Sequence, residues 1–233
     1  MNQRKLALFL SVSTLCLAVS AAGDDRLLVA AWNFNDDSDA PGSQLIASAG
    51  IGELTTNWVV ANLADFAGST VNLLEGDVSG RDLAFQNGGT TGSPANEGNF
   101  LTFQVSTTGL SDLHMTYAGR TTNTGMRDLE WSYSTDGSAF TPFQTVDHVE
   151  DFGGGTYGLV TIDFSSIAAA ANAPMFYVRG TFFTQLGQPD PTASGSTRFD
   201  NFQFTAIPEP SAYAVLFGGL ALILVVRMRR RAR

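Results

Sequence analysis

"FLTFQVSTTGLSDLHMTYAGR", residues 100–120, indicates the fold class of this chain. Its apolar side chains occupy every second position in two runs: Leu101, Phe103 and Val105, then Leu113, Met115 and Tyr117. Successive side chains of a β-strand point to opposite faces, so this alternation predicts strands with one buried face. The residues between the two runs are rich in Ser, Thr and Gly, which favour turns. The stretch therefore predicts two successive β-strands.

Strand-like runs continue on both sides of this stretch. Apolar residues alternate again at Leu129, Trp131 and Tyr133. Asp136-Gly137, which follows them, is a typical hairpin turn. Further short apolar runs occur in LLVAAWNF, NWVVANL, YGLVTIDF, MFYVRGTFF and TRFDNFQF. Eight or more short strands without a repeating βα alternation predict a mainly β protein, an antiparallel β-sandwich with a jelly-roll-like arrangement.

The middle of the chain is expected to form a single domain over residues 23–206. The runs LVAAWNFND and STRFDNFQF look like the first and last strands of one sandwich, which often lie side by side. One interruption is helix-like: SSIAAAANAP, residues 165–174, in which Ser165 or Ser166 would cap a short helix.

Charge is distributed unevenly along the chain. Residues 23–206 hold 21 acidic residues, six arginines and no lysine, a formal charge of −15. Such a body repels phosphate backbones, so we expect no nucleic acid as a partner. Of the 233 residues, 44% are hydrophobic, so the chain is able to bury a core. Its only cysteine, Cys16, lies outside this body, so no disulfide is expected to stabilise it.

The first 22 residues have the three parts of a secretory signal peptide. Arg4 and Lys5 form a positive start, LALFLSVSTLCLAVS is apolar, and the small residues at 20–22 offer a cleavage site. A buried N-terminal helix is the alternative. We therefore expect export by the secretion machinery and removal of residues 1–22 by signal peptidase.

Catalytic motifs are sparse in this sequence. It holds two histidines, His114 and His148, and neither HExxH nor GxSxG. The parity of His114 in its strand places it on the solvent side. A glycosidase or lyase would need only two carboxylates about 5–10 Å apart, and the candidates are Asp128, Glu130, Glu150 and Asp151. The sequence favours a protein that is not an enzyme, with a carbohydrate-active enzyme as the alternative.

Two kinds of binding residue are candidates in the body. Oxygen ligands crowd the turn NFNDDSDAPG, which suggests a structural calcium ion at Asp36, Asp37 and Asp39, joined by Asp200 if the first and last strands are neighbours. A surface Asx turn is the alternative. Aromatic residues that would stack on sugars are Trp58, Trp131 and Tyr157. For Trp131 core packing is favoured over stacking, because its strand alternates regularly.

The C-terminal segment, residues 207–233, has three parts. Pro208, Glu209, Pro210 and Ser211 precede an uncharged apolar run at 212–226. As a helix this run would be about 22 Å long, so with its flanks it would just span a bilayer. The chain then ends in basic residues: Arg227, Arg229, Arg230, Arg231 and Arg233. Because arginines favour the cytoplasmic side, we expect a single transmembrane helix with a cytoplasmic C-terminus.

This order of parts resembles the PEP-CTERM sorting signal over about the last 27 residues. The resemblance implies a Gram-negative bacterium that makes exopolysaccharide, in which a membrane-embedded exosortase recognises the tail and cleaves near Pro208-Glu209-Pro210. The tail would then be a temporary inner-membrane anchor before release to the cell surface or the extracellular matrix. The closing RFDNF and the strand pattern also resemble the jelly-roll bodies often joined to such tails. We therefore expect an exported, non-enzymatic surface or matrix protein that binds or embeds in extracellular polysaccharide.

Overall fold

A computed structural model describes residues 26–35, 45–86, 89–90, 93–94, 96–184, 191–209, 218 and 227. Some of the sequence predictions therefore lie outside the described residues: the signal peptide at 1–22, Asp36, Asp37, Asp39, Pro210, Ser211, Arg229, Arg230, Arg231 and Arg233.

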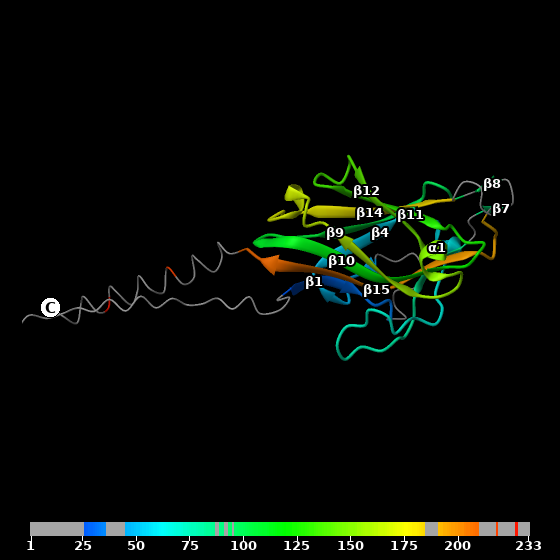
Figure 1. Ribbon diagram of the computed structural model, residues 1–233, viewed down its shortest axis with the longest axis horizontal. Helices are drawn as coiled ribbons and strands as arrows, with labels where there is room; N and C mark the ends of the chain where they lie inside the picture. Colours follow the sequence, from blue (N-terminus) through cyan, green and yellow to red (C-terminus); the bar gives the residue numbers. More distant parts are fainter. Residues whose placement is uncertain are drawn as a thin grey trace, which may run out of the picture.

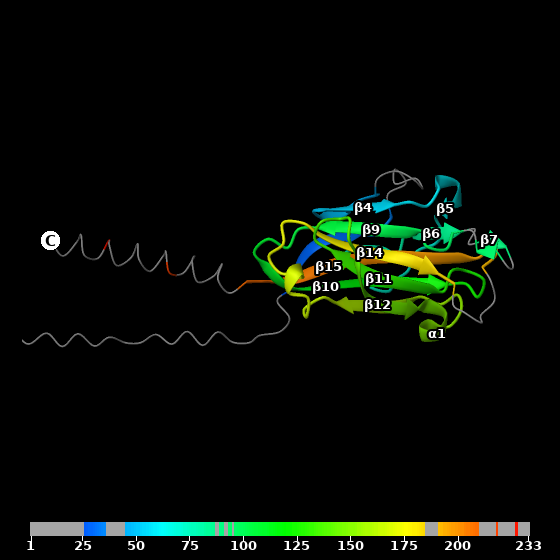
Figure 2. The same ribbon diagram turned by 90° about the horizontal axis from the view of Figure 1, so that it is seen from above.

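The described chain forms two larger antiparallel sheets that lie face to face (Figure 1). Sheet A contains β13 (Gly158–Asp163), β10 (Leu110–Thr121), β15 (Ser196–Pro208), β1 (Leu27–Trp32) and β3 (Ala49–Gly50) in this order, with β6 (Leu83–Gln86) also on β15 and β5 (Leu63–Ala64) on β6. Sheet B contains β12 (Thr141–Asp147), β11 (Asp128–Ser134), β14 (Phe176–Phe183), β9 (Phe100–Val105), β4 (Gly52–Thr56) and β2 (Leu45–Ile46). Figure 2 shows β4, β9, β14, β11 and β12 side by side in sheet B.

The smaller elements lie between these strands in the sequence. They are the 3₁₀ helix η1 (Val60–Asn62), the two-stranded sheet of β7 (Gly89–Thr90) and β8 (Ser93–Pro94), the helix α1 (His148–Phe152) and the 3₁₀ helix η2 (Ala168–Ala170).

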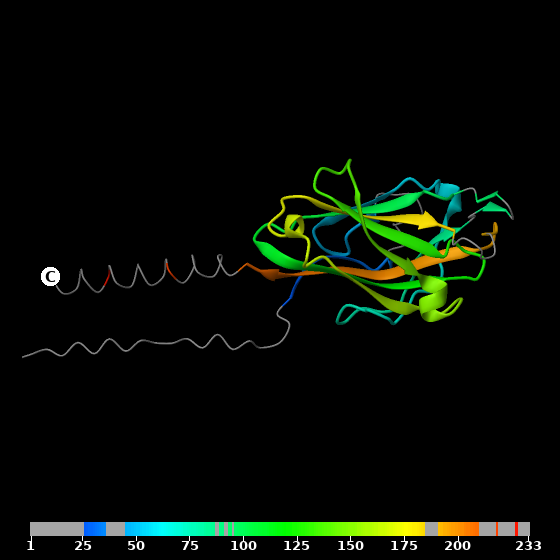
Figure 3. The same cartoon turned by 45° about the horizontal axis from the view of Figure 1, so that its top comes forward.

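Strands far apart in the sequence are neighbours in the sandwich. β1 pairs with β15 from Leu27 opposite Ala206 to Trp32 opposite Phe202, which confirms that the first and last strands lie side by side. β9 pairs with β14 in the same way in sheet B. This wrapping of early strands against late ones is the order of a jelly roll. Figure 3 shows yellow β14 of sheet B above orange β15 of sheet A.

Aromatic side chains from both sheets form the core. Phe103 of sheet B lies with its ring centroid 4.6 Å from that of Phe202 and 5.3 Å from that of Phe204, both of sheet A. Tyr117 and Trp131 meet across the sheets at 5.4 Å. The alternation that predicted β9 and β10 is confirmed, because Leu101, Phe103, Val105, Leu113, Met115 and Tyr117 are all buried.

Two local predictions are wrong. NWVVANL forms no long strand, because Trp58 turns inward against Phe85 and Phe182 and the chain continues as η1. The helix predicted in SSIAAAANAP is only η2, and no side chain caps it. This segment must carry the chain from sheet A to sheet B while it buries Ala170 and Ala173, which leaves room for one short turn.

The last strand extends past the expected domain end at residue 206. Pro208 lies opposite Leu110, and the Glu209 amide donates to the Gly109 carbonyl over 2.9 Å. Of the predicted apolar helix at 212–226, only Gly218 is described, and it is helical and exposed. Within the described part of the chain, no helix has the length and apolar character needed to cross a bilayer.

Candidate functional site

The outer face of sheet B carries an aromatic and polar surface. Leu101, Phe103 and Val105 of β9 point into the core, so Phe100, Thr102 and Gln104 point outward. The same alternation along β14 buries Val178 and Gly180 and turns Tyr177 and Arg179 outward. On β4, Leu54 is buried while Glu53 and Thr55 are exposed. Three adjacent strands therefore present side chains to the same face.

These side chains line a hollow of about 190 Å³, which we call the sheet B groove. It is lined by Glu53, Thr55, Phe100, Thr102, Gln104, Gly137, Tyr177 and Arg179. Strand pairing arranges six of them in two rows across β14, β9 and β4. One row is Arg179, Thr102 and Thr55. The other row is Tyr177, Gln104 and Glu53.

Arg179 lies in this groove between two aromatic rings. Its guanidinium carbon is 3.9 Å from the ring centroid of Phe100 and 3.6 Å from that of Phe140. Its Nε donates to the Thr102 hydroxyl over 3.0 Å. Burial lowers the pKa of Arg179 below its ordinary value. The charge is therefore partly removed from water and held in one plane by three neighbours.

The turn between β11 and β12 forms one side of the groove. Gly137 has a φ of 72° and packs on the Tyr177 ring, where an added Cβ would lie 3.1 Å from the nearest ring atom. Asp136 holds the turn, since its Oδ1 accepts from the Ser138 and Ala139 amides at 2.8 and 2.9 Å. These hydrogen bonds keep the pKa of Asp136 well below its usual range. The predicted Asp136-Gly137 hairpin is thus part of the groove.

The predicted stacking residues lie elsewhere. Trp58 is 4% exposed, so the prediction of an exposed platform is wrong for it, whereas Trp131 is fully buried, which confirms its core packing. Trp58 packs on two phenylalanines, and the indole N–H of Trp131 donates to the buried Tyr117 hydroxyl over 3.1 Å. Tyr157 is half-buried and donates its hydroxyl to Asp82, outside the groove. Burial and this carboxylate raise the pKa of Tyr157.

The groove residues were missed in the sequence, although a signal was present. In MFYVRGTFF the buried positions are Phe176, Val178, Gly180 and Phe182. The positions between them hold Tyr177 and Arg179, an aromatic ring and a charge on the solvent side of a buried strand. The alternation that assigns Leu101, Phe103 and Val105 to the core also assigns Tyr177 and Arg179 to the solvent face of their strand.

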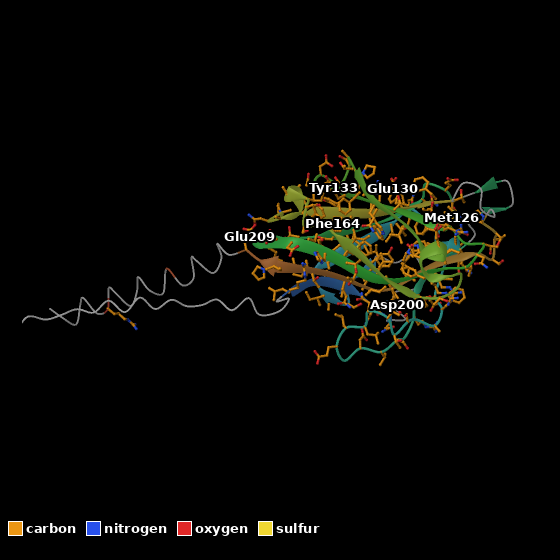
Figure 4. The ribbon with its side chains drawn as sticks, in the orientation of Figure 1. Met126, Glu130, Tyr133, Phe164, Asp200 and Glu209 are labelled. Atoms are coloured by element: carbon orange, nitrogen blue, oxygen red, sulfur yellow. The ribbon has the colours of Figure 1, made fainter. Side chains whose placement is uncertain are left out.

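The predicted carboxylates are placed around β11 and α1. Asp128 and Glu130 point away from the core, as their parity predicted (Figure 4, Glu130). Burial and neighbouring Asp147 raise the pKa of Asp128. Glu150 and Asp151 are exposed on α1.

Asp147, a neighbour of these predicted carboxylates, has a structural role. It caps α1 by accepting from the Val149 and Glu150 amides at 2.8 and 3.0 Å, and it pairs with Arg127 at 3.1 Å. Burial alone would raise the pKa of Asp147, but these hydrogen bonds and Arg127 lower it. The Asp147 carboxylate therefore stabilises the N-terminus of α1 and forms an ion pair with Arg127.

Asp200, the described member of the predicted calcium site, is fully buried in β15 (Figure 4). Its oxygens accept from the Ser69 and Asn201 amides at 2.6 and 2.8 Å. Burial raises the pKa of Asp200 to about 8, and Asp82 and Asp77 add to this. The other three predicted ligands lie outside the described residues, so the calcium site stays a prediction.

Within the described residues, one group has metal-ligand spacing: Asp112, His114 and Asp163. An Nη atom of Arg26 lies 2.7 Å from an Asp112 carboxylate oxygen and 2.9 Å from His114 Nε2. The Arg26 guanidinium therefore already contacts two members of this group and offsets one of its two carboxylate charges. His114 is half-buried and at the surface of β10, consistent with its predicted solvent side.

His148, the second histidine, begins α1 and is fully buried. Its Nε2 lies 3.1 Å from the Tyr117 hydroxyl, in a row that continues to Trp131. Burial lowers the pKa of His148 to about 4. It is therefore a neutral core residue at pH 7.

No protein-family model matches this chain, and no curated protein matches it. Some solved structures are similar to part of this chain. TmCBM61 in complex with beta-1,4-galactotriose is 7% identical with a TM-score of 0.39, over 68% of this chain and 88% of that one. The xylan-binding module CBM15 is 14% identical with a TM-score of 0.38, over 67% and 97%. The CBM22-2 xylan-binding domain from Paenibacillus barcinonensis Xyn10C is 12% identical with a TM-score of 0.39, over 76% and 98%.

Proposed function

We propose that this chain is an exported, non-enzymatic protein that binds extracellular polysaccharide through the sheet B groove. The observation that carries the proposal is the hollow on the outer face of β14, β9 and β4, in which Phe100 and Tyr177 alternate with hydrogen-bonding side chains. Ligand sites in proteins combine a concave surface with aromatic walls and a few placed polar groups.

The chemistry of the groove fits a sugar chain. A pyranose ring has apolar C–H faces and a rim of hydroxyl groups, so it pairs with aromatic rings and with polar side chains at once. Thr55 and Gln104 lie beside the aromatic residues and offer donors and acceptors. The groove lies on rigid strands, which lowers the conformational entropy lost on binding.

Export and sorting are the second part of the proposal. The signal peptide at 1–22 would export the body, and an exosortase would recognise the C-terminal tail in the inner membrane of a Gram-negative bacterium. Leu27 and Ala206 are partners in adjacent strands, so both segments would leave the body from one end. Pro208 is the last residue of β15, and Glu209 follows it directly (Figure 4, Glu209). A processing enzyme at the membrane would reach this point beside the folded body.

One experiment separates binding from catalysis. The full-length chain is incubated with the exopolysaccharide of the producing organism, and both retention and released reducing ends are measured. We expect retention without release, and loss of retention in Tyr177→Ala. Leu159→Ala on β13 of sheet A, which also removes an exposed apolar side chain, is the matched control. Release of reducing ends that disappears in Glu130→Gln or Glu150→Gln would instead show the enzyme alternative. The absence of both retention and release would refute both functions.

A further inference from the structure

Arg179 has no carboxylate partner among the described residues. Four of the other arginines in the body form ion pairs: Arg26, Arg81, Arg127 and Arg198. The body has 21 acidic residues and six arginines, and among its described residues Arg120, which lies over the Tyr157 ring, is the other arginine without an ion pair. Arg179 lies in the groove rather than at an arbitrary place on the surface.

The environment of Arg179 leaves only its outer edge for a ligand. The ring centroids of Phe100 and Phe140 lie 3.9 and 3.6 Å from the guanidinium carbon, and the Thr102 hydroxyl accepts the hydrogen bond from Nε. Within the described chain, neither Nη atom has a hydrogen-bond partner, and neither is sealed from solvent. Two N–H donors are therefore fixed in a plane and accessible from the groove.

A fixed guanidinium edge is complementary to a carboxylate. Its N–H groups form two parallel hydrogen bonds to the two oxygens, and these are stronger than bonds to a neutral hydroxyl because both partners are charged. Partial burial strengthens the pairing further, since less water competes for the charge. A neutral sugar would leave this charge without a counterion.

We propose that the sheet B groove binds a sugar that carries a carboxylate, a uronic acid unit of a polysaccharide, and that Arg179 recognises that carboxylate. This rests on the proposed polysaccharide-binding function. Glu53, exposed on β4 in the same groove, adds an opposing charge. Its negative charge repels densely charged polyanions. Removing this charge should therefore change affinity in the opposite direction to removing the Arg179 charge.

The test uses the full-length chain in detergent and two uronate polymers, alginate and polygalacturonate, each beside its carboxyl-reduced form. We expect the native chain to bind at least one uronate polymer tenfold or more tightly than the reduced form. Arg179→Met, which still fills the space between the rings, should remove this difference, and Arg179→Lys should keep part of it. Glu53→Gln should increase affinity for the uronate polymer. Arg81→Met, which removes one equal charge from an exposed ion pair outside the groove, should change nothing.

The outcomes separate the two proposals. Equal binding of uronate and reduced polymers, or equal binding of dextran sulfate, would overturn recognition of a carboxylate and leave polysaccharide binding intact. Retention on the exopolysaccharide of the producing organism with no affinity for either uronate polymer would do the same. Binding to no polysaccharide would overturn both. Should Arg179→Met fail to fold by thermal melting, an unchanged or lower affinity in Glu53→Gln would still count against the role of the groove charge.

Discussion

The guanidinium carbon of Arg179 lies 3.6 Å from the ring centroid of Phe140, so a residue of the β11–β12 turn covers a charge on β14. The turn and the strand therefore form one binding surface. The ring centroid of Phe100 on β9 lies 3.9 Å from the same guanidinium carbon. Two segments distant in sequence from β14, strand β9 and the β11–β12 turn, therefore fix the direction of the Arg179 side chain.

Phe140→Ala should weaken polysaccharide binding with little loss of stability. Phe140 is half-buried on a turn, so its removal opens one face of Arg179 without emptying the core. A cation–π contact of this kind contributes about 0.5–2 kcal/mol. We expect a several-fold loss of affinity in affinity electrophoresis and a melting temperature close to that of the native chain. Unchanged affinity would show that Phe140 does not orient the guanidinium.

Asp136→Ala should loosen the wall of the groove, whereas Asp136→Asn should not. The Asp136 Oδ1 accepts from two turn amides, and an asparagine side chain keeps an oxygen at that position. The alanine variant loses both hydrogen bonds, so the turn has more freedom over Tyr177. We expect weaker binding in Asp136→Ala, faster amide hydrogen exchange at Ser138 and Ala139, and near-native behaviour in Asp136→Asn. Equal losses in the two variants would assign the effect to charge instead.

The buried Asp200 should make the protein less stable as pH rises. Its pKa is about 8 when folded and about 4 when unfolded, so the folded state binds the additional proton in this window. The contribution of Asp200 to the free energy of unfolding is fully present below pH 4 and is lost as pH rises to 8. The loss is at most about 1.4 kcal/mol per pH unit. Chemical unfolding in EDTA should show the native chain losing stability relative to Asp200→Asn over this range. A difference in the free energy of unfolding between the native chain and Asp200→Asn that does not change with pH would refute the raised pKa of Asp200.

His148 should act in the opposite direction. Its pKa falls from 6.5 to about 4 on folding, so the unfolded state takes up the proton first. Stability is present above pH 6.5 and is lost as pH falls to 4, again by at most about 1.4 kcal/mol per unit. His148→Gln should be less stable than the native chain at pH 7, and this gap should narrow between pH 6.5 and 4. A gap that stays the same would show that His148 does not titrate on unfolding.

The sequence predicted the sandwich because its signal is local. Alternation at Leu101, Phe103 and Val105 depends only on which face of one strand is buried. The groove depends on three strands and a turn that meet in space, and no local pattern joins Glu53, Gln104 and Tyr177.

The wrong predictions have the same origin. Trp58 lies in an irregular stretch, which suggested exposure, but tertiary packing against Phe85 and Phe182 buries it. The α1 helix at 148–152 was missed because the acidic run concealed the Asp147 cap and the inward-facing His148. Burial of a polar residue follows from its partners, here Tyr117, and those lie elsewhere in the chain.

Replacing Pro208, Glu209 and Pro210 by alanine should block release from the inner membrane without unfolding the body. Pro208 lacks an amide proton and is the last residue of β15, so alanine there removes no hydrogen bond. The Glu209 amide bonds to the Gly109 carbonyl through its backbone, which alanine retains. The variant should therefore melt like the native chain.

The sorting effect is then read by fractionation of the producing organism. We expect the triple variant to stay full-length in the inner membrane and the native chain to reach the surface or the medium. Thr205→Ala, a substitution in the same strand just before the motif, is the control for general damage to β15. When all three chains melt alike, a difference in location comes from recognition of the tail. Unchanged delivery of the triple variant would refute exosortase sorting.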